Sequence, residues 1–522
     1  MGERADAATT GSKWLLPVSE FFGFPLDQVF ALGAAFWFRL YLGPCHASPL
    51  VRHAVATLFG IAFVIFCFGW YSVHIVILVL LSYMVIITAD ISNIHRYSLV
   101  LSMGYLTACQ ISRVFIFNYG ILSTDFSGPL MIVTQKITTL AFQLHDGIGK
   151  KPEELTSDQM RLAINQRPSL VEYLSYNLNF LSVLVGPCSN YQDYVDFIDG
   201  RHIQRRLRKQ AEGAGNGHLN GYDKTPDISP LNAVCSKLLV CCGCMLVFLT
   251  VTRSLPIAHN VDPHFISHAP FLTRLVYAFF SIQAARPKFY FAWTLADAIN
   301  NAAGYGFKGM DANGRPSWDL ICNLNIWGIE TATSFKTFID NWNIQTGVWL
   351  KSVCYDRAPR HRMALTFVLS ALWHGVYPGY YFTFITAIPI TAAARAVSAH
   401  DDTFELKYKK NLVRRCFRHY FLFSRGVKRL YDLMTWAATQ LAICYTVMPF
   451  LLLAVEPTMV YYRSMFFHVH LISMLVAIAL HSKHTPATEP PPTPPSSSSP
   501  FPLSMHPSRC QATHSNNNVK AE

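Results

Sequence analysis

The chain has 522 residues, of which 51% are hydrophobic and only 14% are charged. Ordinary soluble domains carry about 25% charged residues, so the composition argues against a soluble globular protein and for a membrane protein. The formal net charge of +12 fits basic loops near anionic headgroups. Nucleic-acid binding is not expected, because no basic face stands outside the apolar segments. The 13 cysteines show no spacing suited to a zinc site or a disulfide framework, so no metal is expected.

Apolar stretches follow a polar N-terminus at residues 1–14. A membrane-spanning helix needs about 20 mostly apolar residues. Eleven stretches approach this requirement, at residues 26–42, 51–71, 73–90, 97–118, 171–188, 233–251, 270–292, 363–377, 379–397, 431–454 and 459–480. Shorter or amphipathic segments occur near residues 128–145, 290–306 and 332–350. The sequence therefore predicts an all-α polytopic membrane protein, with about eleven transmembrane helices and short in-plane helices, in one domain over residues 15–483.

Two loops carry a clear positive charge. Residues 201–209, RHIQRRLRK, hold five basic residues and no acid, and residues 405–429 hold nine basic residues and one acid. The positive-inside rule predicts that both loops are cytosolic. Their charges are interpreted as simple topology signals, and the alternative adds attraction for an anionic cytosolic ligand such as a nucleotide-bearing thioester. The Gly/Asn-rich residues 210–229 predict a mobile linker, and the Pro/Ser-rich residues 484–522 predict a disordered tail.

A histidine lies inside an apolar stretch, in SALWHGVYPGYY at residues 370–381. Burial favours neutral imidazole, which is the form that a general base needs. The GVYPG sequence that follows breaks the helix, and irregular backbone at membrane depth is tolerated where it lines a cavity. His374 is therefore a candidate general base, and Tyr377 beside it is a candidate substrate-binding residue. The alternative is a histidine that only packs against a neighbouring helix.

Polar and aromatic residues alternate in SFKTFIDNWNIQTGVWLK, residues 334–351. Asn343 could orient a substrate hydroxyl or donate a hydrogen bond to a developing oxyanion. Trp342 beside it is a candidate substrate-binding residue. The alternative is an interfacial amphipathic helix with tryptophan anchors. Spacing does not decide between the two, because 31 residues separate Asn343 from His374.

A polar stripe marks AARPKFYFAWTLADAINNAAGYGF, residues 284–307. The residues that recur at helical spacing on one face are Trp293, Asp297, Asn300 or Asn301, and Gly304. Such a stripe serves either as a bond between helices or as the wall of a polar substrate chamber. Arg286 and Lys288 precede it, where they could meet a phosphate or snorkel toward water.

A further segment, DFSGPLMIVTQKITTLAFQLHDG at residues 125–147, begins with a possible N-cap at Ser127. Gln135, Lys136 and Thr139 form its polar side, and we interpret it as an in-plane helix. The chain lacks the G-x-S-x-G sequence of serine hydrolases and the Walker A sequence of nucleotide-binding loops.

The sequence DNWNIQTGVWL followed by SALWHGVYPGYY resembles the membrane-bound O-acyltransferase family. That family's specific signature pairs an Asn after Trp with a His inside an apolar helix. The likeness extends through DFSGPLMIVTQKIT, PSLVEYLSYNLNFLSVLVGP and ARPKFYFAWTLADAINNAAG, and covers roughly residues 15–480. Within the family the chain is most similar to lysophospholipid acyltransferases, in particular the lysophosphatidylserine and lysophosphatidylethanolamine branch.

The resemblance implies a helical bundle that encloses a central chamber. It implies transfer of an acyl chain from acyl-CoA, a co-substrate, to the free glycerol hydroxyl of a lysophospholipid, which we expect to be the sn-2 hydroxyl of lysophosphatidylethanolamine or lysophosphatidylserine. His374 matches the family's catalytic histidine and Asn343 its catalytic asparagine. No cofactor is implied, and the expected location is the endoplasmic reticulum membrane, as a multi-pass protein of phospholipid remodelling.

Two alternatives to this function stay open from the sequence. A multipass transporter or channel would explain the hydrophobicity and the intramembrane histidine, but not the NWN…WHG pair. A family member that acylates a protein or a sterol would explain the pair.

Overall fold

The computed structural model describes residues 27–115, 126–213, 228–409 and 425–481. The predicted polar N-terminus at 1–14, most of the predicted linker at 210–229 and the predicted tail at 484–522 lie outside the described residues. The linker prediction is wrong at its beginning, because the helix that starts at His202 continues to Gly213.

The described residues are mostly helical, which confirms the predicted all-α class. The helices of the first half are α2 (Asp27–Tyr41), α3 (Pro49–Phe68), α4 (Ser72–Thr88), α5 (Ile94–Phe115), α6 (Ser127–Gly149), α7 (Ser157–Leu162), α8 (Leu170–Leu178), α9 (Tyr191–Ile198) and α10 (His202–Gly213). Those of the second half are α11 (Leu231–Val251), α12 (Pro263–His268), α13 (Phe271–Ala302), α14 (Ile326–Glu330), α15 (Phe335–Asn341), α16 (Ile344–Leu350), α17 (Arg362–His374), α18 (Pro378–Lys409), α20 (Arg425–Leu452), α21 (Val455–Ser464) and α22 (His468–His481).

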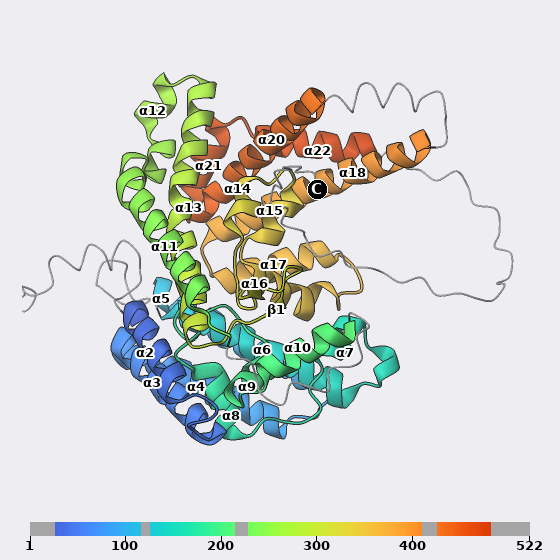
Figure 1. Cartoon of the computed structure of the whole chain (residues 1–522). Coiled ribbons are helices and arrows are strands. Elements are labelled where there is room, and N and C mark those ends of the chain that lie inside the picture. Colours follow the sequence, from blue (N-terminus) through green and yellow to red (C-terminus); the bar gives the residue numbers. More distant parts are fainter. Residues whose placement is uncertain (1–26, 116–125, 214–227, 410–424, 482–522) are drawn as a thin grey trace, which may run out of the picture.

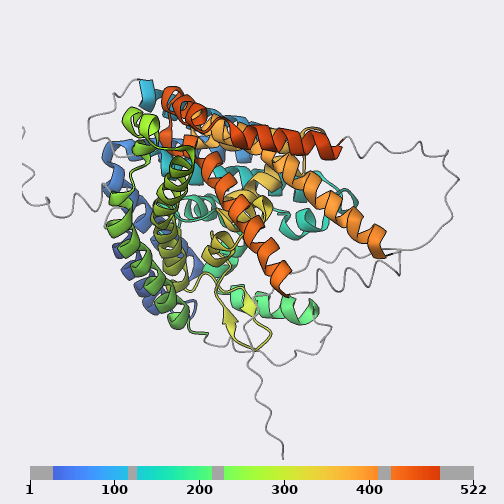
Figure 2. The ribbon, with the colours of Figure 1, turned by 90° about the horizontal axis from the view of Figure 1, so that it is seen from above.

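Short elements connect these helices. A π-helical turn, η5 (Lys351–Tyr355), follows α16 without a break, and such turns are frequent at functional sites. Strands β1 (Gly309–Met310) and β2 (Pro316–Ser317) form one antiparallel hairpin, in which Gly309 pairs with Ser317. Figure 2 shows this hairpin beside α10, and Gln210 of α10 binds both the amide and the carbonyl of Met310.

The helices form three groups around a central segment (Figure 1). Helices α2 to α10 gather at one end, α11 to α13 run along one side, and α18 with α20 to α22 cover the opposite end. Helices α14 to α17 lie between these groups. The largest cluster of buried apolar side chains joins the first group to α13, and it also includes Trp349 of α16 and Trp373 of α17. The short central helices are therefore held by the core of the surrounding ones.

Fewer long apolar helices occur than the eleven spans that the sequence suggests. Among the described residues, three helical stretches are long and apolar enough to cross a membrane: Pro49–Thr88, Leu231–Val261 and Arg429–Leu452. A fourth is possible if the pair Val455–Ser464 and His468–Leu480, bent by 71°, is one span. Eleven spans are thus not confirmed by helix length and composition.

The stretch at residues 171–188 shows why hydrophobicity alone overstates the spans. Helix α8 covers only nine residues and ends before Asn179, whose side chain donates hydrogen bonds to the carbonyl groups of Ser175 and Tyr176. An asparagine that bonds to the preceding turn competes with helix continuation. The apolar residues after it fill the core as irregular backbone, so the predicted span at 171–188 is wrong.

Helix α6 is largely buried, and its predicted in-plane orientation in the membrane stays a prediction. Its polar residues point to several neighbours, since Gln135 binds α16 while Lys136 donates to the Tyr176 carbonyl oxygen at 2.8 Å. Both side chains are fully buried. Buried polar groups of this kind need partners, and the surrounding elements supply them.

Candidate active site

His374 is the last residue of α17, and the helix stops there because Gly375 adopts a φ of 142°. Aromatic rings surround the half-buried imidazole: Phe384 stacks on it with ring centroids 5.4 Å apart, and Phe450 meets it edge-on at 4.9 Å. Tyr380 is a third neighbour at 5.7 Å. The Trp373 ring is a fourth neighbour at 4.7 Å, and the imidazole nitrogens make no hydrogen bond within the described part of the chain.

The end of α17 is fixed by the residue before the histidine. The indole nitrogen of the buried Trp373 donates to the Met131 carbonyl oxygen of α6 at 3.0 Å. The amide nitrogen of Gln110, on α5, donates to the Trp373 carbonyl oxygen at 3.2 Å. These two bonds to different helices hold the backbone that carries His374.

Asn343 precedes the first residue of α16 and adopts a left-handed conformation, with φ 50° and ψ 52°. Its side-chain oxygen accepts a hydrogen bond from the Asn323 amide at 3.1 Å. Asn323 also binds the backbone amides of Ile344 and Gln345, at 2.8 and 3.0 Å. The NH₂ group of Asn343 donates to none of the described residues, which leaves it as a donor for another group.

The structure places α16 and α17 side by side. The indole rings of Trp349 and Trp373 have centroids 5.7 Å apart, and each indole nitrogen donates a hydrogen bond to α6. Asn343 lies six residues before Trp349, or about 9 Å along a helix that rises about 1.5 Å per residue. The two segments with the family signature are 31 residues apart in sequence, and both are held by the same helix, α6.

Trp342 and Trp293 are also brought together. Their rings have centroids 5.4 Å apart in an edge-on arrangement, and Phe338 stacks on Trp342 at 6.0 Å. Both tryptophans are half-buried. Tyr377 is half-buried as well, with its ring 5.9 Å from that of Tyr380 next to the histidine.

The polar stripe of α13 makes bonds to neighbouring elements. Asp297 is buried and forms an ion pair with Lys237 of α11 at 2.7 Å. The Asn300 amide donates to the Leu181 carbonyl oxygen at 3.1 Å, and the Asn301 amide donates to that of Trp318 at 3.2 Å. These contacts favour a role in binding the helices together, and substrate contact by these residues stays a prediction.

Arg286 is buried and already paired. Its guanidinium donates to Glu330 at 3.1 Å and to the Gln440 side chain at 3.0 Å, and it lies over the Phe338 ring. Lys288 is half-buried, with its ammonium 5.6 Å from the centre of the Phe289 ring. The predicted meeting of these two cations with a phosphate stays a prediction, and for Arg286 it would compete with Glu330.

The basic residues at 201–209 are largely neutralised by the preceding helix. Three ion pairs join them to α9 and its end: Arg206 to Asp193 at 2.7 Å, Arg205 to Asp196, and Arg201 to Asp199. The pairs offset three of the five basic charges. Any attraction for an anionic ligand is correspondingly weaker than the bare sequence suggests.

His202 begins the same basic helix. One of its ring nitrogens binds the Gly304 carbonyl oxygen at 3.0 Å, which ties α10 to the end of α13. Burial lowers the pKa of His202 to about 4, although the carbonyl contact opposes part of this shift. The imidazole is therefore neutral at physiological pH and acts as a structural contact.

No group of three or more His, Cys, Asp or Glu side chains is placed to hold a metal ion in the ranges that the structure describes. The chemistry available around His374 and Asn343 is that of a proton acceptor and an amide donor.

Comparison with known proteins identifies the family. A model of the membrane-bound O-acyltransferase (MBOAT) family matches residues 111–447. The chain belongs to this family. Membrane-bound glycerophospholipid O-acyltransferase 1 of Mus musculus is 56% identical over 486 residues, which are 92% of this chain and 94% of the relative. Membrane-bound glycerophospholipid O-acyltransferase 2 of Gallus gallus is 50% identical over 485 residues, 92% of this chain and 90% of the relative.

A more distant relative is lysophospholipid acyltransferase 6 of Drosophila melanogaster, 36% identical over 460 residues, which are 88% of this chain and 60% of the relative. These relatives confirm the resemblance to the lysophospholipid acyltransferase branch of the MBOAT family and the prediction of an acyltransferase enzyme. The family match runs from α5 to α20, so it includes α6, α16 and α17.

The site of this MBOAT enzyme includes residues that sequence reasoning missed. Phe384 and Phe450 contribute rings around the histidine, while Gln110 and Asn323 hold the two candidate catalytic segments. Phe384 could have been found from the sequence, since it lies ten residues after His374 in the same apolar stretch. Gln110 and Asn323 gave no signal, because their partners are far away in the chain.

Proposed function

We propose that this enzyme transfers an acyl chain from acyl-CoA to the free sn-2 hydroxyl of lysophosphatidylethanolamine or lysophosphatidylserine. The names of the relatives support acylation of lysophospholipids, and the headgroup, the position and the donor come from the family resemblance. We place the protein in the endoplasmic reticulum membrane, with about eleven passes of the chain.

In the proposed reaction, neutral His374 accepts the proton of the glycerol hydroxyl as the oxygen attacks the thioester carbonyl carbon. The carbonyl electrons move to oxygen, and the Asn343 NH₂ group donates a hydrogen bond to that oxyanion. The carbonyl bond then re-forms as the carbon–sulfur bond breaks, and the leaving CoA thiolate takes up the proton that His374 accepted, which restores the neutral imidazole. General-base assistance of this kind contributes typically about 10²–10⁴-fold to the rate.

One observation carries the proposal. The imidazole of His374 is enclosed by aromatic rings at the end of a helix and has no hydrogen-bond partner among the described residues. By contrast, one ring nitrogen of His202 binds the Gly304 carbonyl oxygen and so ties two elements together. In the proposed complex, exclusion of water from this site would protect the thioester from hydrolysis.

The test is a panel of lysophospholipids and acyl-CoAs assayed with purified protein in detergent. We expect His374→Ala to abolish turnover while the protein still folds. His361→Ala is the matched control, because His361 is exposed at the opposite end of the same helix. Normal turnover by His374→Ala would remove the base role.

The panel also separates the alternatives. A sealed compartment is absent in detergent, so a transporter would show no acyl transfer there. Transfer to a peptide or a sterol, without transfer to lysophospholipids, would contradict the proposed acceptor. Equal rates with all headgroups would contradict the preference for ethanolamine or serine.

A further inference from the structure

Helix α6 presents one face to the whole segment from Asn343 to His374. The residues of this face are Met131, Gln135, Thr138, Phe142 and Asp146, spaced by four, three, four and four positions. Residues at such spacing lie above one another on a helix. Every one of them contacts that segment, and we call them the anchoring face of α6.

The middle of the anchoring face holds α16. The Gln135 amide donates to the Thr346 hydroxyl at 2.9 Å, and the Trp349 indole donates to the Thr138 hydroxyl at 2.9 Å. All four side chains are buried. Thr346 and Trp349 follow Asn343 by three and six residues, so these bonds determine where the N-terminus of α16 lies.

The Thr138 hydroxyl is well suited to this role. It donates to the Thr134 carbonyl oxygen at 2.7 Å, within its own helix. Because that bond directs the hydroxyl proton toward the helix backbone, the oxygen remains available to accept from the Trp349 indole. A rigid acceptor on one helix thus meets a rigid aromatic donor on the other.

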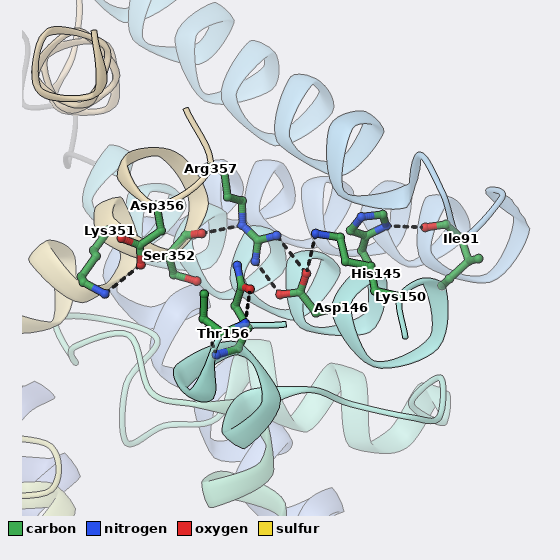
Figure 3. A network of polar contacts seen from close by, with 10 residues as sticks. Ile91, His145, Asp146, Lys150, Thr156, Lys351, Ser352, Asp356 and Arg357 are labelled. Carbon is green, nitrogen blue, oxygen red and sulfur yellow. Dashed lines mark hydrogen bonds and ion pairs between the residues drawn. The ribbon is translucent and has the colours of Figure 1, made fainter. Parts of the chain in front are cut away.

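The two ends of the anchoring face hold the neighbouring parts of the segment. At one end the Met131 carbonyl accepts from the Trp373 indole, beside His374. At the other end Asp146 binds both terminal nitrogens of Arg357, at 2.9 and 2.5 Å (Figure 3). The guanidinium also lies over the Phe142 ring.

Figure 3 also shows how Arg357 reaches the turn after α16. Its Nε donates to the Ser352 carbonyl oxygen of η5 at 2.7 Å. The segment between the two candidate catalytic residues is therefore fastened at four places, always on the same helix: at Thr346, Trp349, Arg357 and Trp373.

We propose that Thr138 and Gln135 are positioning residues for acyl transfer, which hold Asn343 in register with His374 through α16. This inference rests on the proposed function of those two residues. Reacting groups lose rate steeply when misplaced, and a shift of about 1 Å can cost about 10²-fold. Neither Thr138 nor Gln135 needs to touch a substrate for this effect.

The test compares three variants of threonines on α6. Thr138→Val keeps the shape and removes the hydroxyl, Thr138→Ser keeps the hydroxyl, and Thr139→Val removes the neighbouring hydroxyl, whose contact is with Cys188. We expect Thr138→Val to lower kcat about tenfold with an unchanged KM for acyl-CoA. Thr138→Ser should restore most of kcat, and Thr139→Val should match the wild type.

A purely structural role predicts a different pattern. In that case Thr138→Val would lower the melting temperature and the amount of active enzyme, without a change of kcat per folded molecule. Size-exclusion chromatography measures the folded fraction of each variant, and kcat per folded molecule then separates a positioning role from a purely structural one. Unchanged kcat in Thr138→Val, or equal loss in Thr138→Ser, would overturn the inference.

A double-mutant comparison links the effect to Asn343. If Thr138 acts through Asn343, then Thr138→Val should cost little further activity in the Asn343→Ala background, because coupled residues are not additive. The residual turnover is measured with radiolabelled acyl-CoA. A full additional loss in that background would contradict positioning through Asn343.

The outcomes also distinguish this inference from the proposed function. Normal turnover by Asn343→Ala would refute the catalytic assignment, and the positioning role would fall with it. Loss of turnover by Asn343→Ala together with normal turnover by Thr138→Val would refute only the positioning role.

Discussion

Replacing Gly379 with alanine would place a methyl group between α18 and α20, where the two helices touch. The new Cβ would lie 2.1 Å from the Pro449 carbonyl oxygen and 2.8 Å from the Leu453 Cα. The Gly379 amide also donates to the Leu453 carbonyl oxygen at 2.7 Å. The shorter contact is about 1 Å closer than the 3.0 Å that real Cβ atoms keep, so the helices must separate.

Separation of these helices would open the surroundings of His374. Tyr380 and Phe384 come from α18 and Phe450 comes from α20, and all three rings contact the imidazole. Overpacking of this kind costs typically about 1–3 kcal/mol of stability. A shift of about 1 Å near reacting groups costs about 10²-fold in rate. We expect both effects in Gly379→Ala.

The assay measures acyl transfer and thermal unfolding of the purified variant in detergent. Gly243→Ala is the matched control, because a Cβ at this exposed position of α11 meets nothing within 4 Å. That variant should retain full activity and gain up to about 1 kcal/mol from its better helix propensity. If Gly379→Ala were as active and as stable as Gly243→Ala, the close contact between α18 and α20 would not support the site.

Two further predictions concern parts of the fold away from the histidine. Asp146→Ala removes the buried carboxylate and leaves the Arg357 guanidinium, whose side chain is only 16% exposed, without this partner. We expect a loss of about 3 kcal/mol in unfolding experiments, against less than about 1 kcal/mol for the exposed Asp158→Ala. Similar losses for both variants would contradict the buried pair. His202 has a pKa of about 4 in the fold and about 6.5 when unfolded, so its share of stability is complete above pH 6.5 and declines as pH falls toward 4. His202→Gln should flatten this decline in thermal unfolding, and an unaltered pH profile would exclude the contribution.

Local sequence patterns predicted the class of the fold and its most distinctive residues. Helix ends such as that of α17 follow from glycine and proline, whose effects are local. The NWN and WHG sequences could also be recognised as candidate catalytic segments, because each is a short run of consecutive residues. Hydrophobicity was less specific, since buried irregular backbone, as after Asn179, needs apolar side chains as much as a membrane span does.

Pairing across the chain was beyond the reach of local patterns. From the sequence, Arg286 could meet a phosphate or snorkel toward water, and the structure pairs it with Glu330, 44 residues away. The basic residues of α10 were interpreted as a charged loop, and they pair with aspartates of α9. Opposite charges attract wherever the fold brings them together, and sequence distance does not limit that.

By itself, the sequence determined that this protein is helical, belongs among apolar membrane proteins and carries an asparagine and a histidine in two signature segments. Hydropathy and short motifs depend on neighbouring residues, so they can be read along the chain. Only the tertiary structure decided that both segments rest on the anchoring face of α6, through Gln135, Thr138 and the Met131 carbonyl. Hydrogen bonds between side chains more than 200 residues apart depend on the packing of whole helices, and packing is a property of the folded chain.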